Sequence, residues 1–255
     1  MFGPLRKKRV SSRPKASVPE GQRLYAIGDI HGRDDLLDML LDKIMEDDAT
    51  RDVADQQLIF LGDLIDRGPA SAAVVERAMA VATALPNTRL LMGNHEEVFL
   101  KAIGGDEKAM RFFCRIGGRE TILSYGMSEQ DYNRFDYAEL VEETARIVPE
   151  AHRRFIESFE NMVLVGDYAF VHAGIKPEVS LDEQQPGDLR WIRDSFLDHT
   201  APHARIIVHG HSITPAIEER VNRIGLDTGA YTSGRLSAMG FEASKRWGIE
   251  AAIVP

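Results

Sequence analysis

Three short polar turns in the chain carry side chains that bind metals or phosphate. Residues 62–68 (GDLIDRG) place two carboxylates and a guanidinium directly after a short apolar run. Residues 28–32 (GDIHG) come before them and residues 93–96 (GNHE) after them, and each turn opens with glycine after a strand-like run. Because the carboxyl ends of parallel strands meet at one edge of a sheet, we expect the three turns to form one site.

Two later turns supply imidazole, residues 171–174 (VHAG) and 208–211 (VHGH). Oxygen and imidazole ligands suit Mn, Fe or Zn rather than metals that prefer thiolates. A single histidine after a strand is usually structural, but six such groups at strand ends favour a metal site. The candidate ligands are Asp29, His31, Asp63, Asn94, His172 and one of the chemically equal pair His209 and His211.

These ligands are too many for one ion that keeps an open position. They suit two divalent ions that share one carboxylate, and Asp63, the middle carboxylate, is the expected bridge. Two such ions bind phosphoryl oxygens, lower the pKa of a bound water and hold an in-line displacement. The residues therefore predict hydrolysis of a phosphate ester with hydroxide as the nucleophile.

The elements that must position these turns can be read from apolar periodicity. Strand-like runs at 24–27, 57–61 and 88–92 are each followed by a polar turn and a helical pattern, which predicts three parallel strands. From 104 to about 160 short helical patterns dominate and indicate a helical insertion, whose aromatic residues we expect to pack in its core. After residue 161 strand-like runs dominate, and we expect mostly antiparallel pairing there.

The composition is that of a globular protein of 255 residues, with 44% hydrophobic and 28% charged residues. We expect residues 1–20, which are basic and almost without apolar side chains, to be a mobile tail, and residues 21–255 to form one domain. Six basic residues lie in that tail: Arg6, Lys7, Lys8, Arg9, Arg13 and Lys15.

Charge and cysteine content exclude several functions. A net charge of −9 argues against a nucleic-acid partner, and no apolar run approaches the length of a membrane span. Cys114 is the only cysteine, so the chain has no internal disulfide, and a reducing, cytoplasmic location is the simplest expectation. The sequence leaves the oligomeric state open.

The ordered set GDIHG, GDLIDRG, GNHE, HAG (172–174) and GHS (210–212) resembles the phosphoprotein phosphatase branch of the calcineurin-like metallophosphoesterases, in particular its small bacterial and phage serine/threonine phosphatases. The motifs span most of the chain in the family's order. The resemblance implies a mixed α/β fold, a four-layer sandwich of two mixed β-sheets flanked by helices. It also implies two divalent ions, with Mn²⁺ as the first expectation and Fe or Zn as alternatives.

The resemblance also distributes the ligands. It implies that Asp29, His31 and Asp63 hold the first metal, and that Asp63, Asn94, His172 and His211 hold the second. Only the match of GHS to the family's Gly-His-Thr element selects His211 over His209. Asn94 is expected to contact substrate as well.

Four further residues receive roles from the same resemblance. His95 is the expected general acid that protonates the leaving oxygen, and Asp66 is its carboxylate partner. Arg67 is expected to hold phosphoryl oxygens through two N–H groups, a task that suits guanidinium geometry. A Trp-x-Arg pattern at 191–193 resembles phage and bacterial members and favours Arg193 over Arg190 as the second arginine.

Three functions follow from these residues. The first is dephosphorylation of phosphoserine and phosphothreonine in proteins, with phosphotyrosine as a further substrate. The second is symmetrical dinucleoside tetraphosphate hydrolysis, because those enzymes share these motifs and His-Ala-Gly-Ile at 172–175; they tend to lack the residue that stands here as Asp66, which favours the first. The third, a non-catalytic binding module, is disfavoured because every expected ligand and arginine is present.

Overall fold

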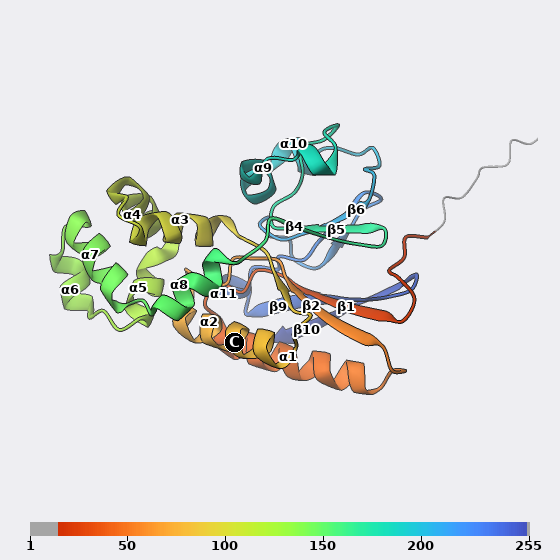
Figure 1. Ribbon diagram of the computed structural model, residues 1–255, viewed down its shortest axis with the longest axis horizontal. Helices are drawn as coiled ribbons and strands as arrows, with labels where there is room; N and C mark the ends of the chain where they lie inside the picture. Colours follow the sequence, from red (N-terminus) through yellow and green to blue (C-terminus); the bar gives the residue numbers. More distant parts are fainter. Residues whose placement is uncertain (1–14, 254–255) are drawn as a thin grey trace, which may run out of the picture.

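The computed structural model describes residues 15–253, in which two five-stranded sheets face each other (Figure 1). In the first sheet three parallel strands are continued by an antiparallel hairpin. Its order is β10-β9-β1-β2-β3, with β1 Gln22–Ile27, β2 Asp55–Phe60, β3 Arg89–Leu90, β9 Arg235–Glu242 and β10 Lys245–Ala252.

The second sheet is also mixed. Its order is β4-β5-β6-β8-β7, with β4 Met162–Val165, β5 Tyr168–Val171, β6 Ile206–His209, β7 Glu218–Glu219 and β8 Arg223–Gly225. The expected antiparallel pairing after residue 161 is confirmed for the pairs β4–β5, β7–β8 and β9–β10. It is wrong for the pairs β5–β6 and β6–β8, whose strands run parallel. The connection from β5 to β6 is long enough for a crossover and carries α9 Pro186–Trp191 and α10 Asp194–Leu197.

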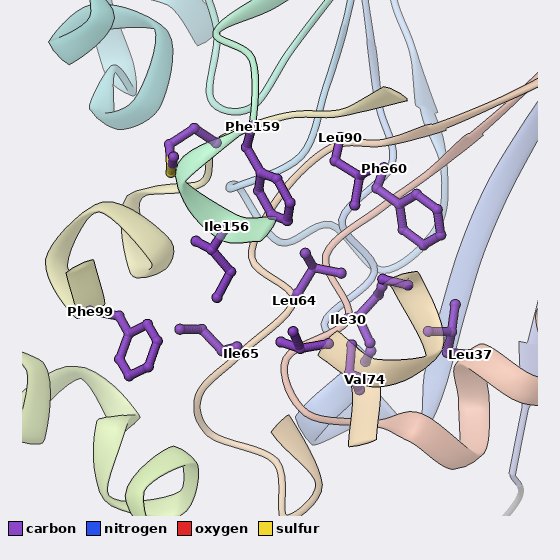
Figure 2. Close-up of a cluster of buried hydrophobic side chains, with 14 of the residues drawn as sticks. Ile30, Leu37, Phe60, Leu64, Ile65, Val74, Leu90, Phe99, Ile156 and Phe159 are labelled. Atoms are coloured by element: carbon purple, nitrogen blue, oxygen red, sulfur yellow. The ribbon is translucent and has the colours of Figure 1, made fainter. Parts of the chain in front are cut away.

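Alternating side chains of the strands divide the core into layers. In β1, Tyr25 and Ile27 face the helices α1 Asp34–Ala49 and α2 Ser71–Ala84, whereas Leu24 and Ala26 lie in the cluster between the two sheets. Figure 2 shows part of the first cluster, including Leu37 and Val74 of the helices and Phe60 of β2.

On the far side, Val171 of β5 packs with Leu189 and Phe196 of α9 and α10. The order is therefore helices, sheet, sheet, helices, which confirms the predicted four-layer fold of two mixed sheets.

Between residues 104 and 160 the chain forms a helical lobe beside the first sheet (Figure 1). Its helices follow α3 Asn94–Ile103 and are α4 Glu107–Phe113, α5 Arg119–Ser124, α6 Glu129–Arg134, α7 Tyr137–Ile147 and α8 Glu150–Glu157. A π-helical turn at Cys114–Gly118 joins α4 to α5, with Gly117 at a φ of 118°. The aromatic side chains pack as expected: Phe113 is buried, and Tyr125 stacks on Phe99 with ring centroids 6.3 Å apart.

The prediction of a mobile tail over residues 1–20 is wrong for the last residues of that range. Val18 is buried and its N–H donates to the carbonyl of Ala243, while Ser17 donates to the carboxylate of Asp167. Residues 16–18 are therefore part of the fold, whereas residues 1–14 of the predicted tail lie outside the described residues. Within residues 15–253, no helix combines the length and the apolar character that a membrane crossing requires.

Candidate metal centre and active site

The predicted ligands meet where the two sheets present the carboxyl ends of their parallel strands. Asp29 follows β1, Asp63 follows β2 and Asn94 follows β3, whereas His172 and His211 follow β5 and β6. Each of these side chains is buried, and none of the six predicted ligands, including His31 of the first turn, is more than 6% exposed.

Asp63 lies at the centre of the group. Its Oδ2 is 3.5 Å from Nε2 of His31, and its Oδ1 is 3.4 Å from Nε2 of His172. Asp63 belongs to two sets of potential metal ligands, and within each set the ligand atoms lie within 4.8 Å of one another. The first set consists of His31, Asp63 and His95, and the second of Asp63, His172 and His211. This is the placement that a carboxylate shared between two ions needs.

The second set also includes the amide of Asn94. Its Oδ1 lies 3.0 Å from Nε2 of His172, which is itself 3.2 Å from Nδ1 of His211. His172 Nδ1 contacts the carbonyl of Leu61 at 2.8 Å, which fixes the ring so that Nε2 faces the centre. His209 is buried elsewhere, against Phe196. Of the two histidines that were chemically equal in sequence, the fold brings His211 to the cluster.

Two buried polar atoms in the cluster are available to bind cations. Oδ1 of Asp29 and Nε2 of His211 have no hydrogen-bond partner among residues 15–253, although Oδ2 of Asp29 accepts from the His211 N–H at 2.9 Å. Burial lowers the pKa of His31 to about 3 and also lowers the pKa of His172 and His211. Neutral imidazoles beside buried carboxylates are the form that ligates metals, so the donor set fits divalent ions.

His95 and Asp66 form a buried pair at the edge of this cluster. Nδ1 of His95 is 2.5 Å from Oδ2 of Asp66, and Nε2 of His95 faces the centre, 3.9 Å from Oδ2 of Asp63. Burial alone would lower the pKa of His95, but the carboxylates of Asp63 and Asp66 outweigh it, and the pKa of His95 is raised. The pair therefore favours an imidazolium that faces the cluster, as a general acid requires.

Two arginines border the cluster. Arg67 places its guanidinium 3.1 Å from Nε2 of His31 and 3.0 Å from Nε2 of His95. Arg193 is exposed, and its charge adds to the burial that lowers the pKa of the cluster histidine His172. Arg190, by contrast, is engaged by Asn161 and Glu97. The structure thus brings Arg67 into contact with two histidines of the cluster and engages Arg190 with Asn161 and Glu97.

Strained backbone is concentrated at the same residues. His31, Asp63, Asp66, Arg67 and His211 all have positive φ angles, between 48° and 74°. Side chains with a Cβ adopt this region at a cost of about 1–3 kcal/mol each, so the surrounding contacts must hold these turns in place.

Several contacts that hold the turns are missing from the sequence interpretation. The carboxylate of Glu96 accepts from backbone N–H groups of two different turns, those of Asp63, Leu64 and Ile65 and that of Gly93.

Thr121, from the helical lobe, donates to the carboxylate of Asp66. Tyr231 packs its ring against the guanidinium of Arg67, at 4.8 Å, and edge-on to His31. The residue type and position of Glu96 hinted at a cap, but no local signal pointed to Thr121.

Comparison with known proteins identifies the family. Residues 22–249 match the family model described as calcineurin-like phosphoesterase. A symmetrical bis(5'-nucleosyl)-tetraphosphatase from Acidovorax sp. (strain JS42) is 32% identical over 160 residues, which is 63% of this chain and 47% of that protein. The chain therefore spans about half the length of that relative. A bis(5'-nucleosyl)-tetraphosphatase PrpE [asymmetrical] from Anoxybacillus flavithermus is 27% identical over 84% of this chain and 88% of its own length.

Solved structures share the fold at lower identity. A candidate diadenosine tetraphosphatase superposes with a TM-score of 0.62 at 20% identity, over 92% of this chain and 97% of its own. A protein serine/threonine phosphatase from Saccharomyces cerevisiae, with similarity to human phosphatase PP5, gives a TM-score of 0.53 at 13% identity, over 92% of this chain and 81% of its own. With the family match over nearly the whole chain, the protein belongs to the calcineurin-like phosphoesterases.

Proposed function

We propose that the protein is a phosphomonoesterase that dephosphorylates phosphoserine and phosphothreonine in proteins, with phosphotyrosine as a further substrate. The observation that carries this proposal is the buried Asp66–His95 pair, in which the second imidazole nitrogen, Nε2, faces the cluster. A serine or threonine alkoxide is a poor leaving group and needs a proton, which this pair supplies. A nucleotide phosphate leaves as a stable anion and needs general-acid help much less.

The proposed ligands divide between two divalent ions, for which we propose Mn²⁺. Asp29, His31 and Asp63 would hold one ion, and Asp63, Asn94, His172 and His211 the other. When bound, the ions supply positive charge for the phosphoryl oxygens and lower the pKa of the attacking water.

The chain's own residues perform the remaining steps. Arg67 and Arg193 hold the phosphoryl oxygens, and Nε2 of His95 gives its proton to the leaving oxygen. Asp66, at 2.5 Å from Nδ1, stabilises the imidazolium before this transfer.

Dinucleoside tetraphosphate hydrolysis is the second candidate, and a different observation favours it. The curated relatives described above are tetraphosphatases that cleave bis(5'-nucleosyl) tetraphosphates. The two candidates share the metal centre and differ in the leaving group, so one set of assays separates them.

The test compares chelated and Mn²⁺-reloaded protein on a panel of phosphoserine and phosphothreonine peptides and on diadenosine tetraphosphate. His95→Asn removes the proposed acid, and His199→Asn, a histidine of the α10–β6 connection that contacts His203 instead of the cluster, is the matched control. We expect Mn²⁺-dependent peptide turnover that His95→Asn lowers by about 10²- to 10⁴-fold and that His199→Asn leaves unchanged.

Efficient tetraphosphate cleavage without peptide turnover would reject the protein phosphatase proposal in favour of the second candidate. Full peptide turnover by chelated protein would reject the proposed metal centre.

A further inference from the structure

Thr121 holds one oxygen of the Asp66 carboxylate while His95 holds the other. The Thr121 hydroxyl donates to Oδ1 of Asp66 at 2.6 Å, and Oδ2 of the same carboxylate lies 2.5 Å from Nδ1 of His95. The Thr121 hydroxyl oxygen also accepts from the Asp66 N–H at 2.8 Å. Thr121 and Asp66 are both fully buried, so no water competes for these contacts.

The restraint comes from a different part of the chain. Thr121 lies on α5 of the helical lobe, 55 residues from Asp66 in sequence. Asp66 and Arg67 are consecutive residues with φ angles of 74° and 67°, so their turn does not hold this shape by local preference. The lobe also holds Arg67, because the Gly117 carbonyl accepts from the Arg67 N–H at 3.0 Å. The helical lobe thus forms hydrogen bonds with both strained residues, Asp66 and Arg67.

A carboxylate has two equivalent oxygens and a soft terminal torsion, so a single hydrogen bond to His95 leaves it free to rotate. The donor on Oδ1 fixes the plane of the carboxylate and directs Oδ2 at Nδ1 of His95. Valine at this position has the shape of threonine but no hydroxyl, and leaves Oδ1 buried without that donor.

We propose that Thr121 is a positioning residue for the general acid, acting through Asp66 on the orientation and proton of His95. The helical lobe is then part of the catalytic apparatus. This inference rests on the proposed role of His95 as the acid that protonates the leaving oxygen.

The test exploits the leaving group. Thr121→Val, in the Mn²⁺-loaded protein, should lower kcat about tenfold or more on a phosphoserine peptide and much less on 4-nitrophenyl phosphate, whose leaving group needs little protonation. Thr121→Ser keeps the hydroxyl and should restore the wild-type ratio of the two rates. Ser71→Ala is the matched control, because Ser71 Oγ contacts the Asp66 N–H and Thr121 but not the carboxylate of Asp66. It should leave the ratio unchanged.

Equal losses on both substrates in Thr121→Val would assign Thr121 a merely structural role and overturn the proposal. So would a wild-type ratio in that variant, or failure of Thr121→Ser to restore the ratio. Thr121→Ala serves as the second variant if Thr121→Val does not fold.

A measurement without turnover separates this inference from the proposed function. In metal-free protein the Nδ1–H proton of His95 should give a downfield NMR resonance in wild type and Thr121→Ser, moved upfield in Thr121→Val. An unchanged resonance in Thr121→Val overturns the positioning role. Absence of all phosphoesterase activity in wild type would reject the proposed function, while the resonance would still report on Thr121.

Discussion

At the scale of single residues, the carboxylate of Glu96 joins two of the turns that form the site. Its Oε2 accepts from the N–H groups of Asp63 and Gly93, at 2.9 and 3.1 Å, and its Oε1 accepts from Leu64 at 2.8 Å. The side chain is fully buried. Glu96 thus supplies acceptors to backbone groups that the strained turn at Asp63 leaves without partners.

We expect Glu96→Gln to destabilise the fold. Glutamine has one acceptor oxygen, and its NH₂ group would face the N–H donors, so a loss of about 1–3 kcal/mol or more should appear in urea unfolding. Glu97→Gln is the control, because the Glu97 carboxylate contacts the side chains of Lys101, Trp191 and Arg190 and no backbone of the two turns, and it should cost about 0–1 kcal/mol. Similar losses in the two variants would show that Glu96 does not join the turns.

The sequence could predict the site residues but not the residues that hold them. Asp29, Asp63 and Asn94 each end a strand-like run, so their meeting followed from the topology of parallel strands. Thr121 has no motif of its own, and its partner Asp66 lies 55 residues away. Glu96 at a helix start looks the same in sequence whether it caps its own helix or also binds a neighbouring turn, and here it does both.

At the scale of elements, the π-helical turn Cys114–Gly118 connects the lobe to Arg67. Gly117 has a φ of 118°, and a Cβ at this position would lie 2.6 Å from Cγ of Arg67 and 3.0 Å from its N. The carbonyl of Ile116 also lies 3.4 Å from Nε of Arg67. The turn therefore requires glycine both for its backbone angle and for the close approach of the arginine.

Gly117→Ala should displace Arg67 and weaken phosphate binding. We expect KM to rise about tenfold, on a phosphoserine peptide and on 4-nitrophenyl phosphate alike, because both present the same phosphoryl oxygens. Competition by inorganic phosphate should weaken in parallel.

Gly105→Ala is the matched control for this variant. Gly105 has a similar φ of 106°, but a Cβ there would meet no atom of residues 15–253 within 4 Å. Both substitutions should cost about 1 kcal/mol or more of stability, since alanine is strained at such angles. A rise in KM of the same size in Gly105→Ala would attribute the effect to general destabilisation rather than to Arg67.

The direction of the strands in the second sheet could not be predicted from the sequence. All four residues of β5 are buried, with Phe170 in the cluster between the sheets and Val171 in the cluster under α9 and α10. A short strand that is buried on both faces has no alternation of polar and apolar residues, and its pattern says nothing about its neighbours. The antiparallel pairing of β5 with β4 has a local cause, because the tight turn at Gly166–Asp167 joins the two strands directly.

At the scale of the whole molecule, the carboxylate of Asp47 links helix α1 to strands β1 and β10 of the first sheet. Asp47, near the end of α1, accepts from the hydroxyl of Tyr25 on β1 at 2.7 Å and from Nε1 of Trp247 on β10 at 3.0 Å. Arg51 donates to both of its oxygens at 2.8 Å and stacks on the Trp247 ring at 3.5 Å. Segments 200 residues apart in sequence are thereby held together at one end of the sandwich.

This network should make stability depend on pH in the acidic range. Burial raises the pKa of Asp47, but the hydrogen bonds from Arg51, Tyr25 and Trp247 outweigh burial, and the pKa lies below its ordinary value of 3.8. The contribution of the Asp47 carboxylate to the free energy of unfolding is therefore fully present above about pH 4, where this carboxylate is ionised in the unfolded chain as well. It is lost as the pH falls through the lower pKa that Asp47 has in the folded state. Asp47→Asn should lower the free energy of unfolding by about 1.5–3 kcal/mol at pH 7. The ionised carboxylate accepts hydrogen bonds from the charged Arg51 and from the neutral Tyr25 and Trp247, and asparagine has no charge to strengthen them.

The measurement is urea unfolding of wild type and Asp47→Asn between pH 7 and pH 2.5. The difference in unfolding free energy should stay constant down to about pH 4 and shrink below it, since protonated aspartic acid and asparagine are then both neutral. Asp42→Asn, also on α1, is a control that should show little difference at any pH, because Asp42 forms none of these contacts. A difference that persists undiminished at pH 2.5 would mean that the shape of the side chain, and not its charge, links helix α1 to the two strands.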